Sequence, residues 1–216
     1  MVELLATDAV SFQVGEQKIL HELSLSFETG SRTTITGPSG GGKSTFLKLL
    51  ASLLTPSSGN IYFENQDIAE LAPETYRMQV SYCFQQPTLF GQTVRDNFLF
   101  PYEIRKQSFD EAHAFALLEE VKLPEHYLDK KVTELSGGEK QRIALIRNVL
   151  FLPKILLLDE VTAGLDEESK QIVNHWLFEL NQKQQVTLIR VTHDAAEIAQ
   201  ATRVKKIVAG RLEEAE

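Results

Sequence analysis

The chain has 216 residues, a formal net charge of −8 at pH 7 and a single cysteine, Cys83. This length supports one sizeable core with room for a subdomain. The negative charge argues against a nucleic acid partner, because such binding neutralises phosphates with clustered Lys and Arg. One cysteine excludes an internal disulfide and suits a reducing cytoplasm, and the sequence has neither a run of about eighteen apolar residues nor a basic, then apolar, N-terminus. We therefore expect a chain that is neither secreted nor membrane-spanning by itself.

The first part of the chain is rich in β-forming residues. Turns are predicted at Gly15-Glu16-Gln17 and Thr29-Gly30-Ser31, so residues 2–36 should form several strands, the last of them at Arg32–Thr36. A glycine-rich segment, residues 37–45, follows. After it, residues 46–50 continue with the apolar spacing of a helix.

The glycine-rich segment matches a phosphate-binding loop. Its glycines allow successive backbone N–H groups to face an anion, Lys43 would contact the β- and γ-phosphates, and Ser44 would ligate Mg²⁺. A helix beginning at Lys43 would direct its positive end at the same phosphates. The residues expected to contact nucleotide are Gly37, Pro38, Ser39, Gly40, Gly41, Gly42, Lys43, Ser44 and Thr45.

The alternative for this segment is a flexible linker. A Gly/Ser linker would be flanked by polar, low-complexity sequence. Here the flanks are a strand pattern and an apolar helix pattern, and this strand, loop and helix order favours a nucleotide site.

Residues 56–60 predict a turn that leads into a strand at Ile61-Tyr62-Phe63. From residue 93 to 135 the apolar spacing becomes helical, with Pro101 and Pro124 as expected helix breakers. A second helix should follow Gly138, and a third should span roughly Glu167 to Asn181. The apolar positions that predict helix between residues 93 and 135 are Phe109, Ala112, Ala116, Leu117 and Val121.

Four apolar residues, 155–158, precede two acids, Asp159 and Glu160. This pattern is typical of a buried parallel strand that delivers carboxylates to the carboxyl edge of a sheet, where a nucleotide would bind. Asp159 is the expected direct or indirect Mg²⁺ partner, and Glu160 is placed to orient and deprotonate an attacking water. A strand that simply ends in solvated acids is the alternative, and the phosphate loop argues against it. Strands at residues 186–191 and 204–208 should complete a mixed sheet.

With these motifs in view, the chain resembles the nucleotide-binding subunits of ABC transporters, from about residue 2 to the end. The resemblance implies an α/β fold of the P-loop NTPase type, with a mixed sheet and RecA-like core, an N-terminal antiparallel β part and a helical subdomain. It implies a single ABC ATP-binding domain over residues 1–216, with the core at 1–90 and 136–216 and the helical subdomain at 91–135.

The resemblance also assigns roles that the residues alone do not. Gln85, rather than Gln86, matches the glutamine that contacts Mg²⁺ and water. Leu135 to Glu139 resembles the signature motif, whose Ser136, Gly137 and Gly138 contact ATP held by a second subunit, with Glu139 in place of the usual glutamine. Residues 163–166 resemble the loop that crosses the dimer interface, with Gly164 in place of a more usual alanine. Asp166, the last residue of this loop, should also cap the next helix. His193 matches the histidine that reaches the γ-phosphate.

Taken alone, each of these signals has an ordinary explanation. A glutamine before proline is usually a turn residue, and a histidine after a strand is usually on the surface. Their order and combination at family spacing favour the functional interpretation. The family's usual adenine-stacking aromatic is missing, because Val14 occupies that position. Phe12 lies on the same strand face and could substitute for it, although a core role is more typical.

The resemblance implies ATP hydrolysis with Mg²⁺ in a homodimer, on a separate integral membrane permease, at the cytoplasmic face of the plasma membrane. The length excludes the fused members with two cassettes. Segments 80–101 and 135–148 are most similar to the ATPase subunits of bacterial iron exporters, which implies iron efflux. The competing function is a soluble ABC ATPase that drives assembly of a cytosolic complex, such as iron–sulfur cluster biogenesis. A catalytically inactive sensor is disfavoured, because Lys43, Asp159, Glu160 and His193 are all present.

Overall fold

A computed structural model describes residues 3–213, which fold as two compact units. The first unit comprises Met1–Tyr82, Pro153–Glu160 and Asn181–Glu216, and the second comprises Cys83–Leu152 and Val161–Leu180. The second unit thus takes in residues 83–90, 136–152 and 161–180 besides the predicted subdomain 91–135. Residue 2, where the expected β-rich segment begins, lies outside the described residues.

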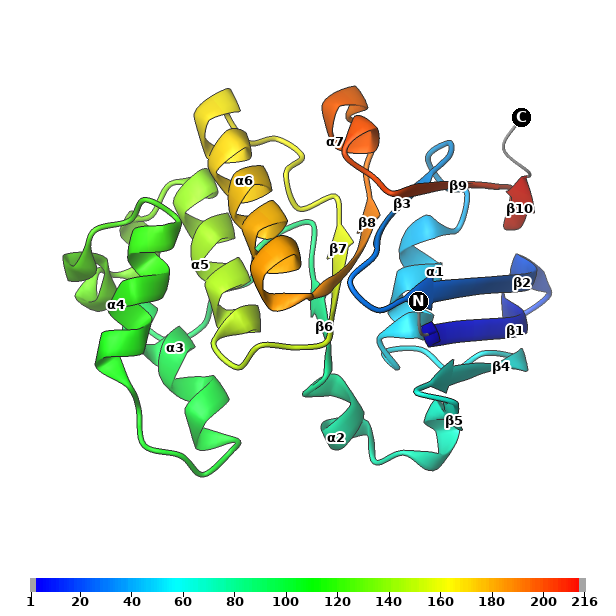
Figure 1. Ribbon diagram of the computed structural model, residues 1–216, viewed down its shortest axis with the longest axis horizontal. Coiled ribbons are helices and arrows are strands. Elements are labelled where there is room, and N and C mark those ends of the chain that lie inside the picture. Colours follow the sequence, from blue (N-terminus) through cyan, green and yellow to red (C-terminus); the bar gives the residue numbers. More distant parts are fainter. Residues whose placement is uncertain (1–2, 214–216) are drawn as a thin grey trace. The chain divides into compact units, whose positions relative to one another are not determined.

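The first unit contains two sheets (Figure 1). One is antiparallel and has the strand order β2-β1-β4-β5, which confirms the expected N-terminal antiparallel part. Its strands are β1 (Glu3–Val14), β2 (Gln17–Glu28), β4 (Ser58–Phe63) and β5 (Gln66–Asp67). Leu23, Leu25 and Phe27 are buried and alternate with exposed serines along β2, so one face of this sheet packs on the core.

The second sheet has the order β10-β9-β3-β8-β7-β6. Strands β9, β3, β8 and β7 are parallel neighbours, whereas β10 runs antiparallel to β9, so the sheet is mixed as expected. Its strands are β3 (Arg32–Thr36), β6 (Val80–Cys83), β7 (Ile155–Asp159), β8 (Thr187–Val191), β9 (Arg203–Val208) and β10 (Arg211–Glu213). Every residue of β7 and β8 is buried, as in a central parallel strand.

One hydrophobic core joins these sheets. Phe46, Leu47, Leu49 and Leu50 of helix α1 (Lys43–Leu50) pack in a single cluster with residues of both sheets. The cluster fixes α1 directly after β3, so the phosphate loop is held at both ends by buried structure. Short helices η1 (Ile68–Glu70), α2 (Pro73–Arg77) and α7 (Ala195–Ala199) complete the unit.

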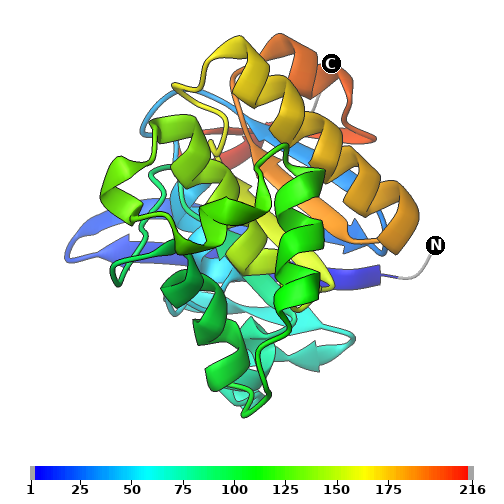
Figure 2. The same ribbon diagram turned by 90° about the vertical axis from the view of Figure 1, so that its left-hand side faces the viewer.

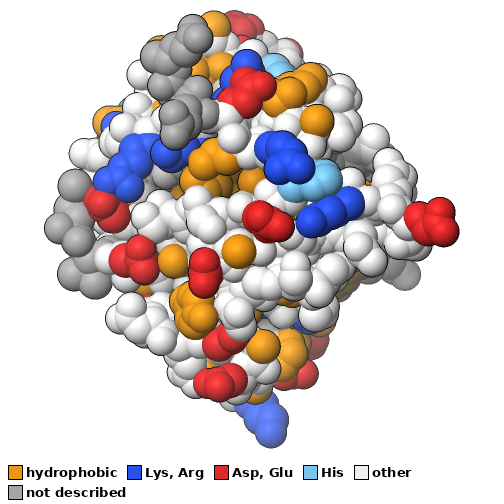
Figure 3. Space-filling view, turned by 90° about the vertical axis from the view of Figure 1, so that its right-hand side faces the viewer, with side chains coloured by type: hydrophobic (Ala, Val, Ile, Leu, Met, Phe, Trp, Pro, Cys, Tyr) orange, Lys and Arg blue, Asp and Glu red, His pale blue; other side chains and the backbone are white. Residues whose placement is uncertain are grey.

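Figure 3 shows the side that carries β10 and the β1–β2 hairpin. Among the side chains coloured by type there, Lys and Arg lie mainly in the upper half and most Asp and Glu lie lower, while apolar side chains occur singly or in small groups. Scattered exposed apolar residues are normal for a protein surface.

The second unit is helical (Figure 2). The helices of this unit are α3 (Val94–Glu103), α4 (Glu111–Glu120), η2 (Glu125–Asp129), η3 (Val132–Glu134), α5 (Gly137–Val149) and most of α6 (Glu167–Gln184). Helix α5 packs beside α3 and α4, and residues such as Phe98, Leu118, Leu128 and Ile143 are completely buried.

Three sequence predictions differ from the structure in detail. Pro101 does not break a helix but lies inside α3, since its ring fixes φ near the helical value and only one backbone N–H is lost. The predicted face of α4 is displaced: Leu117 and Val121 are buried, but Ala112 and Ala116 are exposed. The Asp110 carboxylate caps α4 by accepting from His113 N–H, so Phe109 precedes the helix.

Element boundaries also moved by a few residues. Strand β4 begins at Ser58 inside the expected turn, and α6 continues to Gln184, three residues past its predicted end. The strand at Arg32–Thr36, the helix beginning at Lys43 and the strand ending at Asp159 match their predictions. No helix among residues 3–213 combines the length and apolar character that crossing a bilayer requires.

Candidate functional site

The phosphate loop leaves β3 and enters α1 in the first unit. The Lys43 side chain folds back over the loop, and its Nζ donates to the carbonyl oxygens of Gly37 and Pro38, each at 2.8 Å. Only 5% of Lys43 is exposed. The ammonium group is therefore held at the centre of the loop, where it would meet a bound phosphate.

Gly37 is required by the geometry of this loop. Its φ is +134°, and a Cβ there would lie 1.9 Å from the carbonyl oxygen of Ile207 in β9. Because that atom belongs to the backbone of a sheet strand, it cannot move aside easily, and any larger residue would displace the loop.

Ser44 and Asp159 come together although 115 residues separate them. Ser44 Oγ donates to Asp159 Oδ1 at 2.8 Å, and Tyr82 Oη donates to Asp159 Oδ2 at 2.6 Å. This hydroxyl and carboxylate supply hard oxygen ligands, which suit Mg²⁺ in combination with phosphate oxygens. Among residues 3–213, no group of three or more His, Cys, Asp or Glu is arranged to hold a metal ion.

Tyr82 is a site residue that the sequence analysis missed. It occupies the carboxyl end of β6, the strand that precedes Gln85, and it is buried. A tyrosine at the end of a buried strand, at the same sheet edge as Asp159, was the available signal.

Glu160 and His193 form the second pair at this edge. His193 Nε2 lies 3.5 Å from Glu160 Oε1, and both side chains are partly exposed. Glu160 has φ +49°, a conformation that non-glycine residues rarely adopt and that clusters at functional sites. Its backbone N–H donates to Val191 O at 3.1 Å, which ties the residue to the end of β8.

A buried polar network supports His193. Thr192 Oγ1 donates to Glu197 Oε2 at 2.5 Å, and Arg190 Nη1 lies 3.6 Å from the same oxygen. Thr192 Oγ1 also accepts from the N–H of Asp194, whose carboxylate caps α7. These partners fix the chain on both sides of His193, and the sequence analysis did not identify Arg190 or Glu197.

The charges of the first unit converge on Lys43. Burial lowers the pKa of Lys43, and the nearby carboxylates of Glu160 and Asp159 act in the opposite direction. Lys43, Ser44, Asp159, Glu160 and His193 thus surround one site at the carboxyl edge of the sheet. The arrangement provides a cation, metal ligands and a carboxylate base, which are the parts that phosphoryl transfer to water requires.

Ser136 caps α5 in the second unit. Its Oγ accepts from the N–H of Glu139, and the Glu139 carboxylate accepts from the N–H of Ser136. This reciprocal capping box confirms the expected helix start. Ser136 and Gly137 are exposed, whereas Gly138 is buried against Ser169.

Asp166 caps α6, as the sequence predicted. Its carboxylate accepts from Ser169 N–H at 2.8 Å and from Ser169 Oγ at 2.9 Å, and the backbone bond is the main reason that the pKa of Asp166 is lowered. Gly164 has φ +75°, where alanine would be strained, so glycine at this position follows from the path of the loop.

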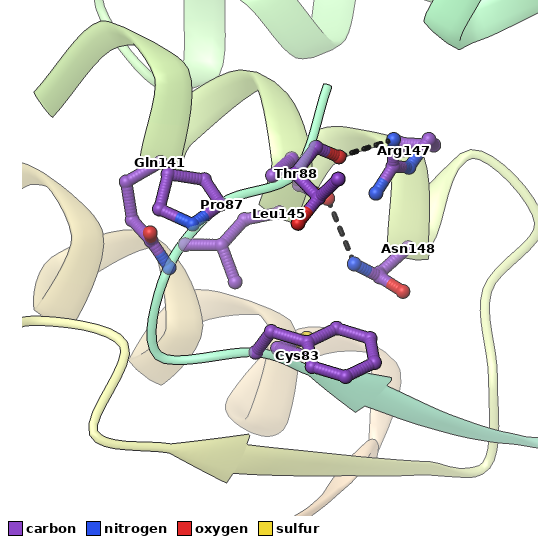
Figure 4. A pocket seen from close by; sticks show the side chains of 9 residues that line it. Cys83, Pro87, Thr88, Gln141, Leu145, Arg147 and Asn148 are labelled. Carbon is purple, nitrogen blue, oxygen red and sulfur yellow. Dashed lines mark hydrogen bonds between the residues drawn. The ribbon is translucent and has the colours of Figure 1, made fainter. Parts of the chain in front are cut away.

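Gln85 lies on the exposed segment that follows β6, as does Gln86. A small pocket near this segment in the second unit has nine lining residues (Figure 4). Arg147 donates to the Thr88 carbonyl there at 2.9 Å and to Asn97 Oδ1 at 3.0 Å. The lining residues are Cys83, Phe84, Pro87, Thr88, Gln141, Ala144, Leu145, Arg147 and Asn148.

The Cys83 thiol should be unreactive in the folded protein. Burial raises its pKa to about 12, although the Arg147 charge acts in the opposite direction, and the thiolate is the nucleophile. We expect no labelling by iodoacetamide at pH 7.5 and complete labelling after denaturation in guanidinium chloride, with mass spectrometry as the measurement. Rapid labelling under native conditions would contradict the burial described here.

The two candidates for adenine stacking differ in environment. Val14 is 60% exposed at the end of β1, whereas Phe12 is partly buried and packs against the core of the first unit. Phe12 therefore follows the core interpretation, and base stacking by either residue stays a prediction.

Comparison with known proteins gives one consistent family. The ABC transporter family model matches residues 20–163. The chain is 49% identical over 214 residues to the "Probable iron export ATP-binding protein FetA" of Escherichia coli (strain K12), covering 98% of this chain and 95% of that protein. It is 39% identical to the "Sulfate/thiosulfate import ATP-binding protein CysA" of Synechococcus elongatus (strain ATCC 33912 / PCC 7942 / FACHB-805), over 87% of this chain and 55% of that protein.

Solved structures agree with the sequence matches. The dimeric post-hydrolysis structure of the ATP-binding cassette MJ0796 bound to ADP and Pi superposes with a TM-score of 0.88 at 27% identity, covering 99% of this chain and 98% of that one. A bacterial Atm1-family ABC exporter with ATP bound gives a TM-score of 0.87 at 31% identity, covering 98% of this chain and 38% of that one. Since the family model spans about two thirds of the chain and FetA matches nearly its whole length, this protein belongs to the ABC transporter family and is an ATP-hydrolysing, ATP-binding subunit.

Proposed function

We propose that the chain is one ATP-binding domain over residues 1–216 that powers an exporter for iron, as a homodimer on a separate integral membrane permease. ATP hydrolysis is supported by two contacts at one edge of the sheet. Ser44 is hydrogen-bonded to Asp159, and Glu160 lies beside His193. The iron assignment is supported by 49% identity to a protein described as a probable iron export ATP-binding protein.

The proposed roles follow from the chemistry of each group. Lys43 and the backbone N–H groups of the loop hold the β- and γ-phosphates of ATP. Glu160 accepts a proton from the attacking water, and His193 binds the γ-phosphate beside it. Gln85 is proposed to orient the water and to contact the metal ion.

Ser44, Asp159 and Gln85 are the proposed protein ligands of Mg²⁺. The ion would neutralise charge that develops on the phosphate oxygens during the reaction. Tyr82 donates to the Asp159 carboxylate, so it orients that carboxylate toward the Ser44 hydroxyl.

Dimerisation would complete each ATP site. We propose that Ser136, Gly137, Gly138 and Asp166 of one copy contact ATP held by the Lys43 loop of the other. Two-fold symmetry then creates two equivalent sites in one interface. The relative MJ0796 was solved as a dimer, which supports this arrangement.

A FetB-like permease is the proposed membrane partner, so the chain would act at the cytoplasmic face of the plasma membrane. Several large apolar side chains of the second unit are exposed, among them Phe84, Phe90 and Phe100. Phe90 and Phe100 pack edge to face at 5.3 Å, and the Arg147 guanidinium lies 5.2 Å from the Phe90 ring centroid. Fixed, exposed aromatic rings are typical anchors in protein interfaces, and we propose that they contact the permease.

Affinity capture tests this function. Tagged Glu160→Gln protein with ATP, captured from detergent-solubilised native membranes, should retain a polytopic membrane protein in equal amount by mass spectrometry. Phe90→Ser in the same background should reduce that recovery at least about fivefold, as loss of an interface hot spot does. Phe178→Ser is the matched control, since Phe178 and Phe90 have similar exposure, 37% and 40%.

Either result of the capture decides between functions. A copurified permease supplies the chain on which iron export is then measured. Recovery of soluble partners only, with the chain absent from membranes, would contradict the transporter assignment and favour an ATPase that drives assembly of a cytosolic complex.

A further inference from the structure

The first turn of α5 contains an acid beside the residue proposed to contact ATP. Glu139 is three positions after Ser136, and only 17% of its side chain is exposed. Oε2 accepts from Ser136 N–H at 2.8 Å and lies 3.4 Å from Lys130 Nζ, while Oε1 accepts from Tyr127 Oη at 2.6 Å. Both carboxylate oxygens therefore have donors.

The charge of Glu139 has an electrostatic consequence. Burial acts to raise the pKa of Glu139, but the hydrogen bonds from Tyr127 and Ser136 and the charge of Lys130 outweigh it, so the pKa is lowered. The group is anionic at neutral pH. A negative charge here stabilises the start of the helix, yet it would repel a γ-phosphate bound at Ser136 unless a cation balances it.

Lys130 is fixed in position to provide this balance. Its Nζ lies 4.0 Å from the centroid of the Tyr127 ring, and its backbone N–H donates to Tyr127 O at 3.0 Å. Its carbonyl accepts from Val94 N–H, at the first residue of α3. The chain of contacts from α3 through η2 to α5 thus sets where the ammonium group lies.

We propose that Tyr127 and Lys130 are positioning residues for the ATP-contacting turn. Tyr127 holds the Glu139 carboxylate against the Ser136 N–H, which keeps the Ser136 hydroxyl accepting from Glu139 N–H and leaves its own proton directed to an incoming phosphate. Lys130 balances the carboxylate charge, so that the end of α5 stays attractive to an anion. This inference rests on the proposed function, in which Ser136 contacts the ATP of a second copy.

A double-mutant cycle separates charge balance from a structural role. Lys130→Met should raise the KM for ATP about threefold to tenfold, the scale of charge effects at a helix terminus, and leave kcat at saturating ATP within about twofold. In the Glu139→Gln background the same substitution should raise KM clearly less, because the carboxylate that holds the Lys130 ammonium group beside the turn is absent. Lys131→Met, at the exposed neighbouring lysine, is the matched control and should leave KM unchanged in both backgrounds.

Tyr127→Phe tests the hydrogen bond to Glu139 by itself. We expect Tyr127→Phe to raise the KM for ATP when Glu139 is present. For Lys130→Met, the increase in KM should be smaller at 0.5 M KCl than at 0.05 M KCl, since salt screens partly exposed charges. The inference is overturned if Lys130→Met raises KM equally in both backgrounds, or if it leaves KM unchanged in the native background.

Ser136→Arg distinguishes this inference from the proposed function. If Ser136→Arg retains full ATPase activity, Ser136 does not contact ATP, and the composite site and the inference both fail. If Ser136→Arg abolishes activity while the Lys130 cycle shows no coupling to Glu139, only the inference fails.

Discussion

Glu160→Gln should lower ATP turnover by roughly 10² or more, the usual loss when a general base is removed. Glutamine has nearly the same size, but it cannot accept the proton of the attacking water. The Glu160 side chain is partly exposed, so this change of nearly equal size should leave the fold intact. Because ATP binding does not need the base, the variant should accumulate as an ATP-bound dimer.

Steady-state phosphate release and size-exclusion chromatography with ATP check these expectations. Glu16→Gln, in the exposed turn between β1 and β2, is the matched control and should behave as the native chain does. Near-normal turnover by Glu160→Gln, or a monomer in the presence of ATP and Mg²⁺, would rule out the proposed role of Glu160.

Ser136→Arg should abolish ATPase activity while the monomer keeps its nucleotide affinity. Ser136 is exposed at the start of α5, so a long side chain there is accommodated by solvent in the monomer. In the proposed dimer it would occupy the space needed by the γ-phosphate of the other copy, and one clash would affect both symmetric sites.

Fluorescent nucleotide binding and phosphate release measure the two properties separately. Ser26→Arg, on the exposed side of β2, provides the matched control for the size and charge of the new side chain. A large loss of nucleotide affinity in the Ser136 variant would instead mean that the serine contacts the ATP of its own subunit, or that it is needed for α5 to fold.

The features predicted from sequence are those that a short segment determines. The helix start at Lys43, the strand that ends at Asp159 and the caps at Ser136 and Asp166 each depend on a few consecutive residues. Their backbone geometry is fixed by local sterics and local hydrogen bonds, so pattern and residue type suffice.

The features that sequence analysis missed depend on residues distant in the chain or on competing local effects. Tyr82 reaches Asp159 across 77 positions, and its place at the end of a strand does not reveal which residue its hydroxyl contacts. Arg190 interrupts an apolar strand, and only the fold shows that it forms an ion pair with Glu197 of α7. Pro101 continues its helix because helical φ and burial outweigh one lost hydrogen bond.

The contacts of Lys43 bear on how nucleotide can enter and leave. Its ammonium group donates to two carbonyl oxygens of the loop itself. An arriving phosphate oxygen must therefore replace a carbonyl oxygen as the hydrogen-bond acceptor of Lys43. The loop also keeps its path through backbone packing at Gly37. Nucleotide exchange then requires reorientation of the buried Lys43 side chain and not refolding of the loop. The backbone of the phosphate loop should therefore follow the same path with and without bound nucleotide.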